Sequence, residues 1–190
     1  MLFQFVQVLY WLALATWFGG VLFIAVAAPV IFRTINEADP TLPRVLSVNL
    51  DKQHSTLLAG SIVANLLNLL VRVQLACAGA LFVTMIAQWV YIDRGNNPHL
   101  WAAILRTAMF LAAVVLAVYD WLVVWPRVQQ HRQEYIDHAD EPDIANPAKE
   151  KFDRYQDESV TVLRNILFLL LGIILFSGDI SMHATKLTFQ

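Results

Sequence analysis

Four long apolar stretches, separated by polar segments, dominate the pattern of the chain. They cover Leu2–Phe32, Leu57–Ile92, Leu100–Trp125 and Val160–Met182. A helix rises about 1.5 Å per residue and a hydrocarbon core is about 30 Å thick, so roughly 20 apolar residues suffice for one crossing. Each stretch passes that test. The pattern predicts an all-α fold: an integral membrane four-helix bundle forming a single transmembrane domain over residues 1–190.

The polar segments predict how these helices are connected. Gly95-Asn96-Asn97-Pro98 is a strong turn signal, and so short a connection predicts that the second and third helices are antiparallel neighbours. Residues 127–159 carry mixed charges and are expected to form a cytoplasmic loop. Within this loop, Gln129–His138 could continue the third helix and Ala148–Ser159 could lead into the fourth.

The second apolar stretch is too long for one bilayer. As a continuous helix it would measure about 54 Å, so its first turns should protrude or lie along the surface. Ser61, Asn65, Asn68 and Arg72 recur at spacings of four, three and four, which places them on one helical face. This overlong helix is therefore expected to begin with an amphipathic cytoplasmic segment. The polar stripe has a second interpretation, as a binding surface or the lining of a cavity.

Composition supports the membrane interpretation and narrows the class of partner. Hydrophobic residues make up 58% and charged residues 15% of the 190 residues, whereas soluble domains carry about 25% charged residues. The net charge of −2 contains no basic block, so nucleic acid is not an expected partner. Cys77 is the single cysteine, which excludes an internal disulfide and a cysteine-based zinc site.

The distribution of Lys and Arg predicts the orientation. With four crossings, the first and third connections share one side of the membrane with ten bases: Arg33, Arg44, Lys52, Arg72, Arg127, Arg132, Lys149, Lys151, Arg154 and Arg164. The other side has Arg94, Arg106 and Lys186. Because cytoplasmic segments carry the excess of positive charge, both termini are expected outside a bacterial inner membrane.

Charged residues inside the apolar stretches fall into two layers. Arg106 and Asp179 are expected near the outer face, at depths where they could pair. Asp120 is expected near the inner face, where Arg164, Arg72 or Arg33 could neutralise it. Charges inside a membrane are costly and often functional. Two interpretations follow: ion pairs that fix helix register, or stations on a proton or cation path.

Motifs for catalysis or cofactor binding are lacking in the sequence. There is no Gly-x-Ser-x-Gly, phosphate-binding loop or His-Glu-x-x-His motif, so we expect no enzyme activity and no cofactor. The histidines lie in loops or at helix ends, which argues against a buried haem. A metal site formed by His99, Asp179 and His183 stays open as a third hypothesis. Small residues on the first and fourth helices predict close helix packing: Gly19, Gly20, Gly172 and Gly178.

Several short motifs resemble a bacterial four-helix membrane domain family of unknown function, which is related to the eukaryotic transmembrane protein two hundred and five. These motifs are Trp17-Phe18-Gly19-Gly20 followed by Phe23, Pro29 and Phe32; Leu58–Val63; Trp125-Pro126-Arg127; and Phe152-Asp153-Arg154-Tyr155 followed by Ser159, Leu163 and Asn165. Where this family commonly has a histidine, the chain has Gln156, and its connector Thr34–Leu57 is longer. The resemblance implies a four-helix membrane fold and supplies no catalytic residue. The eukaryotic relative is linked to drug resistance.

These observations lead to two functional hypotheses. The first is a non-catalytic membrane component, either self-associating or an accessory subunit of a larger assembly. Its expected partners are membrane lipids and other membrane subunits or a second copy of the chain. The alternative is a small transporter or exporter, in which Asp120 and Arg164 act with the polar stripe as an inner gate.

Overall fold

The computed structural model describes the backbone of residues 2–38, 54–91, 100–138 and 141–187 and the side chains of residues 4–37, 58–89, 100–138, 141 and 143–178. This part of the chain is helical: α1 (Leu2–Ala38), α2 (His54–Tyr91), α3 (Leu100–Tyr119), the π-helix η2 (Asp120–Val124), α4 (Trp125–Asp137) and α5 (Pro142–Leu187). Four spans within it are long and apolar enough to cross a membrane, with α3, η2 and α4 forming one of them. The all-helical prediction is confirmed, and the four apolar helices indicate a multi-pass membrane protein.

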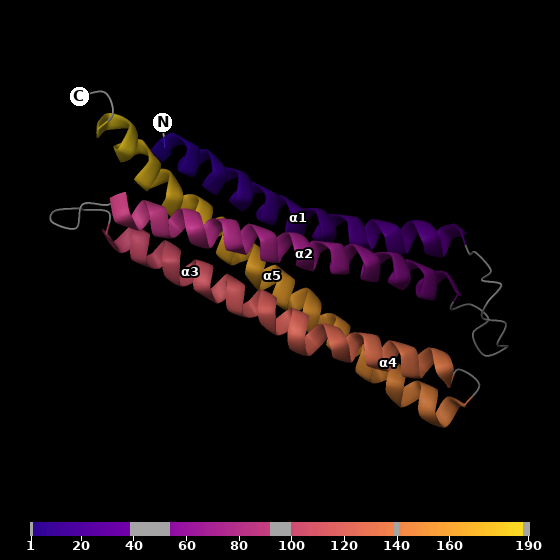
Figure 1. Ribbon diagram of the computed structural model, residues 1–190. Helices are drawn as coiled ribbons and strands as arrows, with labels where there is room; N and C mark the ends of the chain where they lie inside the picture. Colours follow the sequence, from indigo (N-terminus) through magenta and orange to yellow (C-terminus); the bar gives the residue numbers. More distant parts are fainter. Residues whose placement is uncertain (1, 39–53, 92–99, 139–140, 188–190) are drawn as a thin grey trace.

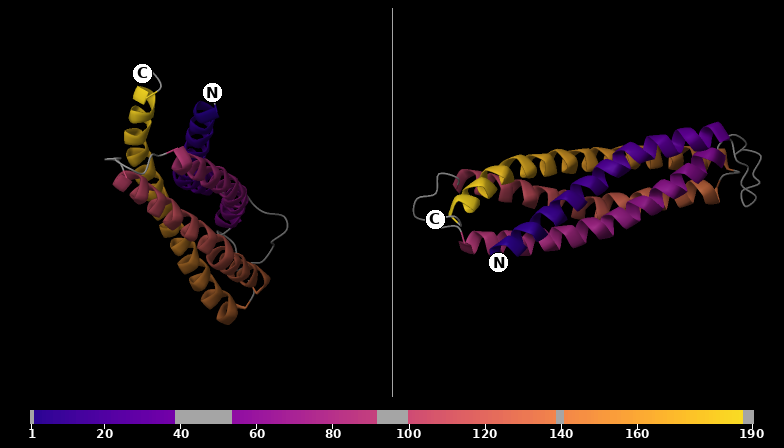
Figure 2. Two further views of the ribbon diagram at one scale, coloured as in Figure 1. Left: turned by 60° about the vertical axis from the view of Figure 1, so that its left-hand side comes forward. Right: turned by 90° about the horizontal axis from the view of Figure 1, so that it is seen from above.

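The four spans form two groups. α1 packs along α2, while α3 and α4 pack along α5, and α1 also touches α5. The start of α1 and the end of α5 lie at one end of the molecule, and the turn between α4 and α5 lies at the other (Figure 1). Seen from a second direction, the α1–α2 pair diverges from α3, α4 and α5 towards that second end (Figure 2).

The prediction that the second and third helices are antiparallel neighbours is supported only near their ends, and antiparallel packing along their length stays a prediction. α2 and α3 touch at few places; near their joined ends the indole Nε1 of Trp89 donates to Thr107 Oγ1 at 3.3 Å. A turn brings two helix ends together without fixing which faces pack further along. The closest approaches are found elsewhere. A Cβ at Gly20 would lie 3.1 Å from Leu70 of α2, and a Cβ at Gly172 would lie 2.8 Å from Met109 of α3.

The segment of residues 127–159, for which a cytoplasmic loop with helical extensions at both ends is predicted, contains both extensions, and its cytoplasmic location stays a prediction. Most of it is helix: α4 continues the third span to Asp137, and α5 begins at Pro142 and runs without a break into the fourth span. The two suggested helical extensions are therefore present: the first ends at Asp137, one residue before the suggested His138, and the second begins at Pro142 instead of Ala148. The Glu141 carbonyl accepts from the amides of Ile144 and Ala145 at 3.0 and 2.9 Å. Proline is well tolerated at the first helical position, where its missing amide hydrogen has no partner to lose.

The first span likewise extends beyond its predicted end at Phe32 to Ala38, with Pro29 inside the helix. Arg33 Nε lies 3.9 Å from Glu37 Oε1, one helical turn away.

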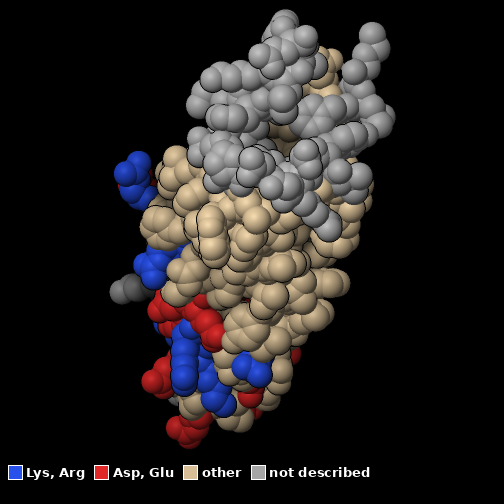
Figure 3. Space-filling view, turned by 90° about the vertical axis from the view of Figure 1, so that its left-hand side faces the viewer, with Lys and Arg blue, Asp and Glu red and all other residues tan. Residues whose placement is uncertain are grey.

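Charged side chains gather at the end of the visible face that is built by α4 and the beginning of α5, while the other described residues of this face are largely uncharged (Figure 3). The described part of the chain thus has a long apolar body and a highly charged end at α4 and the start of α5.

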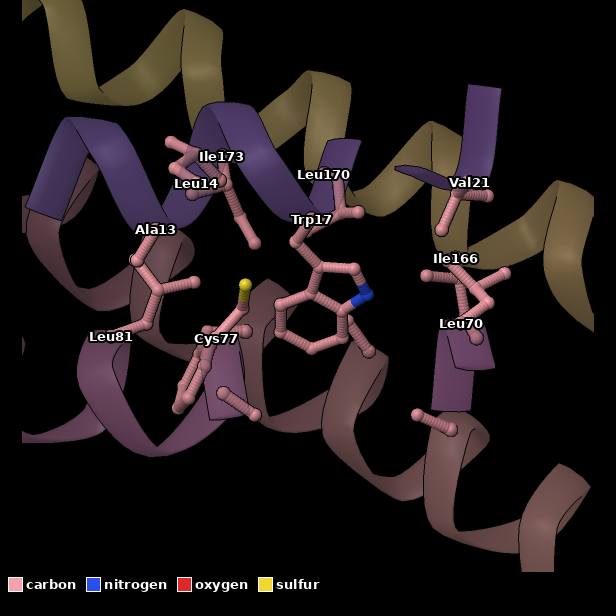
Figure 4. Close-up of a cluster of buried hydrophobic side chains, with 14 of the residues drawn as sticks. Ala13, Leu14, Trp17, Val21, Leu70, Cys77, Leu81, Ile166, Leu170 and Ile173 are labelled. Carbon is pink, nitrogen blue, oxygen red and sulfur yellow. The ribbon is translucent and has the colours of Figure 1, made fainter. Parts of the chain in front are cut away.

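The core fills the apolar body where α1, α2, α3 and α5 meet. Trp17 is fully buried at its centre, and Figure 4 shows its indole among side chains from α2 and α5, with Cys77 close by. Leu14, Leu81, Ile166 and Leu170 are fully buried around it. Among the described residues, this core contains two ionisable side chains, the Cys77 thiol and the Tyr10 hydroxyl. It separates a polar cluster at one end from a cavity at the other.

Candidate functional site

The polar cluster joins α1, α3 and α5 through a chain of contacts. Ser177 Oγ donates to the Ile173 carbonyl at 2.6 Å, so its single hydrogen is used, and the Tyr10 hydroxyl donates to Ser177 at 2.6 Å. Arg106, 1% exposed, lies over the Tyr10 ring with its guanidinium carbon 5.3 Å from the ring centroid. A further bond joins α2 to α1, from Gln88 Nε2 to Gln7 Oε1 at 3.1 Å. The cluster holds three helices in register.

A double-mutant cycle tests this role of the cluster. We expect Tyr10→Phe and Ser177→Ala to show a coupling of about 0.6 kcal/mol in the free energy of unfolding, and at most about 1.7 kcal/mol, which is the range of hydrogen bonds between membrane helices. The measurement is unfolding of the detergent-solubilised protein with increasing dodecyl sulfate. Fully additive single-variant effects would contradict the role.

The cavity lies between the α1–α2 pair and the α4–α5 pair, where the two groups diverge. Its volume is about 420 Å³, within the roughly 300–1,000 Å³ of small-molecule sites. Most of the lining is apolar. The polar lining side chains all come from α4 and α5: Gln129, Arg132, Gln156, Ser159 and Arg164.

Asp120 lies behind this cavity wall at the π-helix. The Trp125 amide donates to the Asp120 carbonyl, five residues back, and this wider turn lies directly before Pro126. Proline lacks an amide hydrogen and clashes with the preceding turn, so a local π-turn relieves the strain. The Asp120 carboxyl is 5% exposed and faces Ser159 of α5. Asp120 Oδ1 and Ser159 Oγ each lack a hydrogen-bond partner among the described residues.

The predicted ion pairs of Asp120 are not formed in the described part of the chain. Arg33, Arg72 and Arg164 are exposed, and no described basic side chain lies within 4 Å of the Asp120 carboxyl. Arg33 approaches Glu37 instead. The arginines point outwards because their long side chains can reach polar surroundings, whereas the short Asp120 side chain stays inside. The predicted pairing of Arg106 with Asp179 lies outside the described residues, since the side chain of Asp179 is not among them.

The polar stripe of α2 faces away from the cavity. Asn65, Asn68 and Arg72 are exposed, while the α2 residues that line the cavity are Gly60, Val63, Ala64 and Leu67. The stripe therefore does not line this cavity, and its interpretations as an amphipathic helix start, a binding surface or the lining of another cavity stay predictions. The Ser61 hydroxyl donates to the Leu58 carbonyl at 2.7 Å within its own helix.

Two of the four glycines expected in helix packing do not contact a neighbouring helix. Nothing among the described residues lies within 4 Å of a Cβ built at Gly19 or Gly178, in contrast to Gly20 and Gly172. The metal hypothesis for His99, Asp179 and His183 falls outside the described side chains. Elsewhere in the described chain no group of three metal-ligating side chains occurs.

The residues that line the polar part of the cavity were not recognisable as one site from the sequence. Arg132 and Gln129 fall in a segment whose charges suggest a solvated face, and Gln156 stands out only as a departure from a family pattern. The spacing of these residues is the sequence feature that could have identified them. Gln129 and Arg132, and Gln156 and Ser159, are pairs three residues apart, so each pair shares one face of its helix.

No curated protein and no solved structure matches the chain. One family does, and it is described as a domain of unknown function (DUF4149); it matches residues 12–136, from α1 to the end of α4. The expected resemblance to a family of unknown function is confirmed to this extent, while its link to a eukaryotic relative stays a prediction. The match covers well over half of the chain, which belongs to the DUF4149 family.

Proposed function

We propose that this protein is a non-catalytic component of a bacterial inner membrane that associates with a second copy of itself through the outer face of α2. If the protein is instead an accessory subunit of a larger assembly, the same face would contact the neighbouring subunit. The single observation that supports this function is the exposure of Asn65, Asn68 and Arg72 on a membrane-spanning helix.

The exposed face of α2 continues beyond these polar residues. Ala76 and Gly79 follow on it, and a Cβ at Gly79 would meet nothing within 4 Å. Small residues let a second helix approach closely, and side-chain amides form hydrogen bonds between membrane helices. Without such a partner, amides that face hydrocarbon lack hydrogen bonds. The face therefore combines a close-contact region with groups that need a partner.

A second copy satisfies these groups because an asparagine amide both donates and accepts. In a twofold interface the same patch meets itself, so Asn65 and Asn68 can pair with their own counterparts. Arg72 carries a charge that would repel its counterpart. Its side chain is long enough to reach the headgroup region instead.

The proposal includes a topology. Antiparallel neighbouring helices, with both termini outside, place the charged α4–α5 end in the cytoplasm, as the excess of Lys and Arg favours. The first turns of α2 then form an amphipathic segment at the inner surface. The proposed relationship to the eukaryotic transmembrane protein two hundred and five rests on the sequence motifs.

Cysteine cross-linking in native membranes tests self-association. Cys77 is the single cysteine of the chain and is buried, so an introduced surface cysteine supplies the accessible thiol. We expect Asn68→Cys to form a covalent dimer under mild oxidation. The matched control is Phe168→Cys on α5, where the native side chain is 63% exposed, and it should stay monomeric.

The asparagines themselves are tested by replacement. We expect Asn65→Leu with Asn68→Leu to weaken the dimer in mild detergent several-fold, because interhelical hydrogen bonds contribute about 0.6 kcal/mol each. The proposal would be refuted if the wild type is monomeric in mild detergent and Asn68→Cys forms no covalent dimer. Equal cross-linking at positions 68 and 168 would show random collision.

A transporter is the second candidate function. The observation that favours it is the buried Asp120 beside a cavity that opens between two helix pairs. The polar stripe does not belong to that cavity, so the inner gate would consist of Asp120, Ser159 and Arg164. Unaltered flux in cells that contain Asp120→Asn at normal protein level would remove this candidate.

A further inference from the structure

The cavity between the two helix pairs is long enough to hold part of a hydrocarbon chain. Its lining on α5 runs from Phe152 to Leu167, which corresponds to about 22 Å along a helix. A volume of about 420 Å³ spread over that length makes a narrow channel. Its walls are apolar towards the middle of the molecule, where Val21, Ile24, Val63 and Leu167 lie.

The other end of the cavity is polar and cationic. Arg132 lies there with Gln129 of the same helix and Gln156 of α5, and Arg164 lies further along the channel. These arginines are the charged residues of the lining, and no carboxylate is among the described lining residues. Neither arginine has an ion pair in the described part of the chain. The cavity lining therefore carries two arginines without an ion pair, the partly buried Arg132 and the exposed Arg164 at its edge.

We propose that this cavity binds a membrane phospholipid with an anionic headgroup. Its headgroup phosphate accepts hydrogen bonds from Arg132 and from the side-chain amides of Gln129 and Gln156, and one acyl chain fills the channel towards Val21 and Leu167. Arg164 adds positive charge beside the channel. Basic pockets between membrane helices on the cytoplasmic side are suited to anionic headgroups, and guanidinium groups are suited to phosphate.

The choice of occupant follows from charge and shape together. A zwitterionic lipid fits the channel but leaves the two arginines without net compensation. A free phosphate ester compensates the charge but leaves the apolar channel empty. An anionic phospholipid satisfies both parts of the cavity, and the surrounding membrane supplies it.

Binding of phosphatidylglycerol to the full-length protein tests this inference. Dissociation constants are measured by native mass spectrometry in detergent, with phosphatidylcholine of the same acyl chains and soluble glycerol phosphate as the comparison probes. We expect phosphatidylglycerol to bind more tightly than either. Removal of both charges in Arg132→Gln/Arg164→Gln should weaken its binding about 30-fold, or about fivefold per arginine, and should weaken phosphatidylcholine binding much less, because that lipid has no net charge.

The control variants separate the cavity from general surface charge. Arg154→Gln removes an exposed positive charge of α5 that does not line the cavity, and it should leave binding of phosphatidylglycerol unchanged. Ala28→Trp places a large side chain in the apolar lining and should weaken binding of both lipids. Size-exclusion chromatography confirms that each variant is folded. If Arg132→Gln/Arg164→Gln fails to fold, Arg132→Gln and Arg164→Gln are measured separately.

Three outcomes overturn the inference: equal affinity of the wild type for both phospholipids, an unchanged preference in Arg132→Gln/Arg164→Gln, or an equal loss in Arg154→Gln. Competition by glycerol phosphate at the same concentration as the lipid would assign the site to a soluble phosphate ester and overturn it as well. None of these outcomes depends on self-association through α2, whose stripe lies outside the cavity.

Discussion

Replacement of Trp17 by alanine is expected to lower the free energy of unfolding by about 3–5 kcal/mol, the range for a large aromatic side chain removed from a core. Trp17 is fully buried, and its indole meets Phe110 of α3 edge to face at a centroid distance of 6.4 Å. Lipid is as apolar as the core, so the loss reflects van der Waals packing and the cavity left behind. Unfolding of purified protein in detergent with increasing dodecyl sulfate measures it.

Two variants control for this effect. Trp101 of α3 is 79% exposed, so Trp101→Ala should change the free energy of unfolding by less than about 0.5 kcal/mol. Trp17→Phe keeps an aromatic ring and removes the Nε1 hydrogen, which has no acceptor among the described residues, so its loss should be smaller than that of Trp17→Ala. A loss below about 1 kcal/mol for Trp17→Ala would contradict the central position assigned to this residue.

The four spans could be predicted from the sequence because the length of an apolar stretch is a local property. Packing partners could not, since they depend on how side chains of distant segments fit together. Gly20 faces Leu70 and Gly172 faces Met109, yet neither pair is distinguished in the sequence from Gly19 or Gly178. The turn signal in the sequence of residues 95–98 predicts that α2 and α3 meet at their ends, and it does not predict how much of their length is in contact.

The cavity was beyond prediction for a related reason. Its lining comes from four helices. Each helix contributes apolar residues that the sequence does not distinguish from residues of the hydrophobic core. Its polar end lies on α4 and the first half of α5, which the mixed charges of residues 127–159 made look like a loop. The outward direction of Asn65 and Asn68 was equally undetermined, because periodicity defines a face without stating what that face meets.

The sequence predicts an ion pair for Asp120, and the structure shows none within the described residues. Its replacement by an apolar residue should therefore raise the free energy of unfolding. Asp120→Leu keeps a similar shape and removes a buried carboxyl oxygen that has no partner among the described residues. We expect the free energy of unfolding to rise by about 1–3 kcal/mol, the cost of an unsatisfied buried polar group. The dodecyl sulfate assay measures it, and Asp120→Asn should give a smaller rise.

The exposed Asp157 of α5 provides the matched control, and Asp157→Leu should change the free energy of unfolding by less than about 0.5 kcal/mol. A loss of stability above about 1 kcal/mol in Asp120→Leu would show that the carboxyl has a stabilising partner and would contradict the prediction. A gain has a consequence for function. Proteins keep destabilising groups where activity needs them. If Asp120→Leu is more stable and loses flux in cells, the result would favour the transporter. If Asp120→Leu combined with Asn68→Cys still forms the covalent dimer, self-association through α2 would remain intact.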